Sequence, residues 1–300
     1  MVSVVVFLYL IDYAARLLRP ISIVQRVGES GIAVIQSVYP KSTAGPRPVE
    51  PPRLPASPER TVATAGASGV VLAVDLAGLV GQARRASGVI EFVPQVGDFV
   101  AVDEPLFRLY GGASAIDDRQ LRAAVALGSE RTLDQDPTFA FRILVDIAIK
   151  ALSPAINDPT TAVVAIDQLH RLLRLAGLQH TRGQEIRDAD GQLRLVFRTP
   201  NWEDFVHLTC IEIRHCGAGS VQIPRRMRSM LENLAQTLPP HRHGELRQQL
   251  ELWDRAIEGS YSFPEDRAIA RIPDPQGLGG TLGVQAQSEA PPAEGEGRNQ

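Results

Sequence analysis

Residues 136–162 read DPTFAFRILVDIAIKALSPAINDPTTA, and this stretch sets the class of the fold. One Asp-Pro pair stands at Asp136-Pro137 and a second at Asp158-Pro159. Aspartate is a preferred N-cap and proline suits the first helical position, so each pair predicts the start of a helix. Ser153-Pro154 predicts the end of the first helix, because a residue before proline avoids helical geometry. We therefore expect two consecutive helices joined by a short turn.

The chain after this stretch also has mainly helical patterns. Apolar residues of the second helix recur at helical spacing and predict its buried face: Val163, Ile166, Leu169, Leu173 and Ala176. Further helices are expected at 202–216, 221–238, 244–257 and 264–269. Between the second helix and this group, residues 188–191 read DADG between two apolar alternating runs, which predicts a β-hairpin.

The chain before this stretch predicts a β-rich unit. Strands are expected at 69–75, 89–93, 99–102 and 106–110, with helices at 76–86 and 117–127. Residues 96–100, VGDFV, together with 105–107, PLF, are similar to turns of the biotinyl/lipoyl-type β-sandwich. Those domains carry their cofactor on a lysine, whereas the only lysines of this chain are Lys41 and Lys150. We therefore expect no covalent cofactor here.

The N-terminus carries an unbroken apolar run at 4–11. A membrane-spanning helix needs about 20 such residues, so the run is half a span, and a short buried helix is the alternative. No basic region precedes it, which disfavours a signal peptide. Arg16, Arg19 and Arg26 follow it, and this bias places the next part of the chain in the cytoplasm. We expect residues 1–38 to form one or two helices that pack poorly on the rest, although Gly28 and Gly31 would admit a close neighbour.

Composition excludes several classes of protein. The chain has 300 residues, of which 44% are hydrophobic and 22% charged, with a formal net charge of −3. These values are typical of globular proteins. The net charge gives the protein no overall positive potential that would attract nucleic acid. Two cysteines cannot build a disulfide framework. The chain contains no nucleophile-elbow or phosphate-loop motif.

Polar residues gather in the turns before the two central helices, and we take these turns as candidate binding sites. The candidates are Glu130, Arg131, Asp134 and Asp136 in the first turn, and Asn157, Asp158, Thr160 and Thr161 in the second. Asp136 and Asp158 are expected to act first as caps, and exposed amides at a helix start can also bind anions. A straight helix would hold the two turns roughly 24 Å apart. His207, Cys210, His215 and Cys216 lie on one expected helix without a matching second pair, so no metal is expected.

The two turns also carry a resemblance. The chain resembles the bacterial predicted-membrane-protein family catalogued as domain of unknown function twenty-two fifty-four. The resemblance rests on residues 130–137 and 144–162, together with 96–100, 202–204 and 263–268. The resemblance implies an N-terminal bundle of membrane helices, a linker and a soluble portion, and it implies no catalytic residues. Residues 8–12 match the exit of the last membrane helix, so we expect an N-terminally truncated chain or a mis-assigned start.

These observations predict an α+β fold. We expect residual membrane and juxtamembrane helices at 1–39, a Pro-rich linker at 40–65 and a small β-rich, sandwich-like module at 66–112. A mainly helical domain follows at 113–271, with a hairpin near 184–198, and then a disordered tail at 272–300.

The expected role is a binding, regulatory or assembly module that serves a bundle of membrane helices. Transport is one function that such a bundle could have. We expect it at the inner membrane, with the soluble portion in the cytoplasm. The alternative is an enzyme or cation site built from the turns 130–136 and 157–161. A structural oligomerisation unit is the third reading. The expected partners are the membrane, a second copy of the chain and a small ligand of unidentified class, but no nucleic acid.

Overall fold

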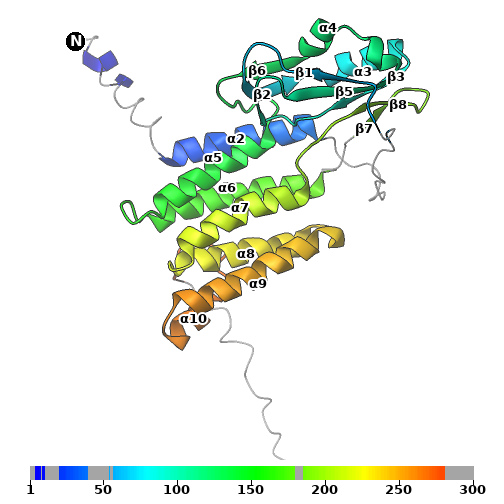
Figure 1. The fold of residues 1–300 in the computed structure, drawn as a ribbon. Coiled ribbons are helices and arrows are strands. Elements are labelled where there is room, and N and C mark those ends of the chain that lie inside the picture. Colours follow the sequence, from blue (N-terminus) through cyan, green and yellow to red (C-terminus); the bar gives the residue numbers. More distant parts are fainter. Residues whose placement is uncertain are drawn as a thin grey trace, which may run out of the picture.

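The computed structural model describes residues 4–7, 9–10, 20–39, 54, 57–179 and 185–280. Its helices are α2 (Pro20–Val38), α3 (Leu76–Arg85), α4 (Asp118–Arg122), α5 (Pro137–Ala151), α6 (Pro159–Leu178), α7 (Trp202–Gly217), α8 (Gln222–Thr237), α9 (His243–Ser260) and α10 (Pro264–Ala270). Its strands are β1 (Arg60–Ala63), β2 (Gly69–Val74), β3 (Gly88–Phe92), β4 (Phe99–Val100), β5 (Pro105–Gly111), β6 (Val125–Gly128), β7 (Glu185–Arg187) and β8 (Leu193–Val196). Figure 1 shows the longer helices stacked in layers from α2 and α5 to α10, with the strands gathered beside one end of the stack. The α+β class is confirmed.

The helical part has its own apolar core, and α2 belongs to it. Val24, Ile35 and Tyr39 are at most 2% exposed and lie in the same buried cluster as residues of α5 to α9. Residues 20–38 therefore pack closely on the bundle, and the expectation of poor packing is wrong for them. The expected buried face of α6 is confirmed, since its five apolar residues are all at most 5% exposed.

The strands form two small sheets within the described residues. The larger sheet has the order β1-β5-β3-β8-β7 and the smaller has the order β4-β2-β6. Strand β3 pairs in parallel with β8, and the other pairs are antiparallel. The expected hairpin thus joins the β part, although its sequence lies among the helices. Residue 184 lies outside the described residues.

Three further expectations need correction. Residues 60–63, expected in the linker, form β1 against β5, whereas 40–53 lie outside the described residues. The helix expected at 117–127 ends at Arg122, and Val125–Gly128 pairs with the edge of β2 instead. Asp274, expected in the tail, is fully buried and accepts hydrogen bonds from the amides of Gln276, Gly277 and Gly279. Residues 281–300 lie outside the described residues.

The expected membrane helix finds no counterpart among the described residues. No helix there has both the length and the apolar content that crossing a bilayer requires.

Candidate functional site

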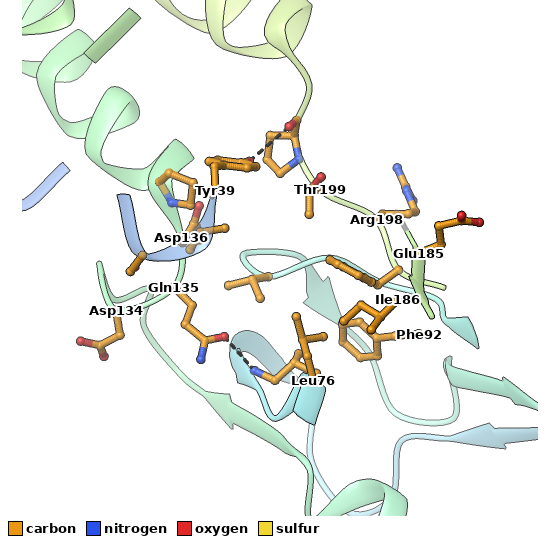
Figure 2. Close-up of a pocket in the computed structure, with 17 residues that line it drawn as sticks. Tyr39, Leu76, Phe92, Asp134, Gln135, Asp136, Glu185, Ile186, Arg198 and Thr199 are labelled. Atoms are coloured by element: carbon orange, nitrogen blue, oxygen red, sulfur yellow. Dashed lines mark hydrogen bonds between the residues drawn. The ribbon is translucent and has the colours of Figure 1, made fainter. Parts of the chain in front are cut away.

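A pocket of about 680 Å³ lies at the junction of the helical part and the β part. Its walls come from segments far apart in the chain: 37–39 at the end of α2, Val74 and Leu76 where β2 meets α3, 134–137 at the start of α5, and 185–186 with 197–200 around the hairpin. Figure 2 shows these segments converging on one space. The packing of the hairpin against β3 and of α2 against α5 therefore creates this pocket.

Asp136 fixes the helical side of the pocket. Its Oδ1 accepts a hydrogen bond from the Phe139 amide at 3.2 Å and another from the Thr138 hydroxyl. Its Oδ2 accepts from a guanidinium nitrogen of Arg131 at 3.3 Å, and the residue is only 2% exposed. The expected N-cap role is confirmed, and Arg131 acts as the partner of that cap.

Gln135 ties this segment to the β part. Its Oε1 accepts a hydrogen bond from the backbone N–H of Val74 at 3.1 Å, as the lower dashed line in Figure 2 shows. Asp136 also lies against the loop between β3 and β4, since a β-carbon on Gly97 would lie 2.5 Å from its Oδ2. The turn before α5 thus connects the two halves of the protein.

Tyr39 supplies a buried hydroxyl on the same, helical side of the pocket, next to Asp136 (Figure 2). The hydroxyl donates to the carbonyl of Pro200 at 3.2 Å, and the ring meets Phe205 edge-on at 6.2 Å. Burial, and then the carboxylates of Asp136 and Asp204, raise the pKa of Tyr39. The phenol therefore stays protonated and acts as a donor.

Most of the remaining wall is apolar. Leu76, Phe92, Ile186 and Phe197 line it, whereas the charged ends of Asp134, Glu185 and Arg198 point away from the centre in Figure 2. The hydroxyl of Thr199 is buried and has no hydrogen-bond partner among the described residues. An apolar interior with a few polar groups is typical of a small-molecule site.

The second predicted turn lies elsewhere. Helix α5 has 15 residues, which separate the two turns by roughly 22 Å. Asp158 caps α6 as expected, and its Oδ1 accepts from the Thr161 amide at 3.0 Å. Hydrogen bonds from the Thr161 side chain and amide lower the pKa of Asp158. Asn157 takes a left-handed conformation with φ of 47°.

The structure therefore divides the eight predicted site residues. Asp134 and Asp136 line the pocket, Arg131 holds Asp136, and Glu130 is exposed beside them. Asn157, Asp158, Thr160 and Thr161 stay at the far end of α5. Sequence reasoning missed Tyr39, Ile186 and Thr199, because only long-range pairing brings them to the pocket. The apolar alternation of the hairpin was a signal for a strand, but it did not identify β3 as its neighbour.

The described residues contain no group of three histidine, cysteine or acidic side chains that could hold a metal ion. His207 hydrogen-bonds instead to a carboxylate oxygen of Glu245 at 2.8 Å. Burial raises the pKa of the Cys210 thiol to about 12, and Cys216 is exposed. The lining of the pocket itself offers apolar contact with a few hydrogen-bonding groups.

In sequence, the chain is similar to a family of predicted membrane proteins and to uncharacterised bacterial proteins. The model of a family described as "Predicted membrane protein (DUF2254)" matches residues 1–233. Uncharacterised proteins of Mycobacterium bovis and Mycobacterium tuberculosis are each 29% identical over 276 residues, which cover 89% of this chain and 53% of theirs. The chain thus spans about half the length of these relatives. No solved structure matches it.

Proposed function

This chain belongs to the predicted-membrane-protein family DUF2254, and from this premise we propose that it is the binding and regulatory module of a bacterial membrane protein. Its folded part lies in the cytoplasm, beside the inner membrane. The junction pocket takes a small, mainly apolar molecule. Ligand binding there changes how the β part sits on the helical bundle, and this change reaches the membrane through α2.

The observation that carries this proposal is the composition of the pocket wall. Tyr39 directly follows α2 and Asp136 directly precedes α5, whereas Leu76 and Ile186 belong to the β part. A ligand in this space touches both halves of the protein at once. If the ligand makes better contacts in one arrangement of the β part on the helical part than in another, its binding favours that arrangement.

The chemistry of the wall favours a particular class of ligand. Aromatic and aliphatic side chains supply contact area, so the body of the ligand is apolar. The polar groups of the wall are few and are bonded within the protein, as Asp136, Gln135 and Tyr39 show. The ligand therefore needs few polar atoms.

The alternative of an enzyme or cation site joining the two polar turns needs them to converge. Helix α5 holds them at its opposite ends. Asp136 and Asp158 are each occupied in capping the helix that follows. The binding module is accordingly the better-supported reading.

Titration with the apolar fluorophore 1-anilinonaphthalene-8-sulfonate tests the proposal on the full chain. Ile186→Trp fills the pocket, and we expect it to reduce the fluorescence enhancement strongly. Val102→Trp is the matched control, because Val102 lies on the β part, is 46% exposed and does not line the pocket. The apolar N-terminal run is unchanged in both variants. Equal enhancement in the two variants, with both folded, would argue against a ligand pocket.

A further inference from the structure

Helices α2 and α6 run in parallel, and their register brings two distant segments together. A β-carbon on Gly28 would lie 2.4 Å from Oε1 of Gln168, and one on Gly31 would lie 3.0 Å from Leu172. Both helices rise equally per residue, so counting back about two turns from Gly28 places Ile21 level with Thr161. Figure 1 shows the start of α2 and the α5–α6 turn at the same end of the bundle.

Large apolar side chains are exposed at this end. Ile21 and Ile23 at the start of α2 are 49% and 40% exposed, and Ile156 in the α5–α6 turn is 49% exposed. Leu278 is 71% exposed and follows Gly277, where an added β-carbon would lie 2.5 Å from Val163 in the first part of α6. We call Ile21, Ile23, Ile156 and Leu278 the α5–α6 end.

The chain that leads into this end is itself apolar. Six of its residues are helical and at least 50% exposed: Val4, Val5, Val6, Phe7, Tyr9 and Leu10. Exposed aliphatic and aromatic side chains of this kind are suited to contact with lipid. The bundle end nearest to it in the chain is the α5–α6 end, because α2 begins there.

From this juxtaposition we infer that the α5–α6 end is a membrane-contact surface, on which Ile156 and the start of α2 enter the lipid interface. The occupant is the phospholipid bilayer, since the apolar run precedes, in the sequence, the helix whose start carries the exposed isoleucines, and the chain belongs to a predicted-membrane-protein family. The polar turn at Asn157 to Thr161 then stands at the membrane surface, while the turn at Asp134 to Asp136 stands at the pocket. The two polar turns thus have separate roles at the two ends of α5.

A lipid-quenching experiment tests this surface in the full chain. A fluorophore is attached at Ile156→Cys in a Cys216→Ser background, in which the fully buried Cys210 does not react. The vesicles contain phosphatidylcholine and phosphatidylglycerol with a nitroxide-labelled lipid. Leu178→Cys is the matched control, because Leu178 is 51% exposed and lies at the other end of α6. We expect quenching by the nitroxide lipid at position 156 but not at position 178.

An unlabelled variant makes the test independent of the fluorophore. Ile156→Asp removes one inserted side chain, so its vesicle affinity should fall about tenfold in co-sedimentation. Leu178→Asp should bind as the unchanged chain does. Equal quenching at both positions, no quenching at 156 in bound protein, or no vesicle binding would each overturn the inference. Protection of position 156 by self-association without quenching would identify a second copy of the chain as the occupant, and would overturn it too. The inference does not depend on the pocket. A negative result in the vesicle experiments would therefore leave the proposed ligand pocket untouched, and loss of the pocket proposal would leave the membrane-contact surface untouched.

Discussion

A β-carbon on Gly31 of α2 would lie 2.8 Å from the β-carbon of Ala140 on α5. Real β-carbons do not approach so closely, and a methyl group of Ala140 cannot rotate away. The contact therefore requires glycine, and it holds α2 on the bundle. This packing explains why α2 belongs to the core of the helical part, although an apolar stretch precedes it in the sequence.

Gly31→Ala is accordingly expected to destabilise the protein by about 1–3 kcal/mol through overpacking. Gly259→Ala in α9 is the control, because an added β-carbon there meets nothing within 4 Å. That change should stabilise by up to about 1 kcal/mol, since alanine favours the helix more than glycine does. Urea unfolding of both variants measures the difference. A neutral Gly31→Ala would show that α2 can shift on α5.

Asp136 should matter more for stability than an ordinary helix cap. Asp136→Ala loses the amide bond to Phe139 and also the contacts with Thr138 and Arg131. We expect a loss of about 2 kcal/mol, at the upper end for N-caps. Asp75 caps α3 through the amide of Gly78 and is exposed, so Asp75→Ala should cost about 0.5–1 kcal/mol. Comparable losses in thermal unfolding would contradict the role of Asp136 in joining the two halves.

The turn at Asn157 offers a test of strain against binding. Its φ of 47° is left-handed, which asparagine tolerates and alanine does not. Asn157→Ala should cost about 1 kcal/mol, whereas Asn157→Gly should be close to neutral because glycine accepts this geometry. Asp158→Ala should also cost about 1 kcal/mol as a lost cap. If Asn157→Gly lost stability as Asn157→Ala does, the asparagine side chain would have a role that its backbone geometry does not explain.

His170 should make stability fall as the pH is lowered. Burial and then Arg226 lower the pKa of His170, and its Nε2 lies 3.0 Å from the amide oxygen of Asn233. The unfolded histidine titrates near its ordinary pKa of 6.5, so below that pH the unfolded chain takes up the proton first. The stabilising contribution is present above that value and is lost as the pH falls through it.

His170→Gln should therefore flatten the dependence of the melting temperature on pH between about pH 7 and 5.5. His215 is exposed, and His215→Gln should leave the dependence unchanged. An unchanged slope in His170→Gln would assign the pH dependence to other groups.

Much of the fold could be predicted because its signals are local. The Asp-Pro pairs at Asp136 and Asp158 specify both a cap and a first-turn dihedral, and both helices begin there. The helix at 117–127 was wrong because Val125–Gly128 pairs with β2, and this long-range pairing overrides local helix propensity. The same limit applies to the hairpin, whose parallel neighbour β3 lies about a hundred residues earlier.

Only those pocket residues that carry a local sequence signal could be predicted. Asp134 and Asp136 stand out in the sequence as a polar turn, and they do line the pocket. Tyr39, Leu76 and Ile186 look like ordinary core residues, and only the meeting of α2, β2 and the hairpin gives them a shared space. Asn157 has equally polar neighbours, but the length of α5 keeps it away from the pocket.

The central claim is that the junction pocket holds a small apolar ligand, and native mass spectrometry of the full chain gently extracted from membranes tests it most directly. The account predicts a discrete added mass on the unchanged chain and on Val102→Trp, and its loss from folded Ile186→Trp. An unchanged chain without bound molecule, or the same added mass on folded Ile186→Trp, would contradict it.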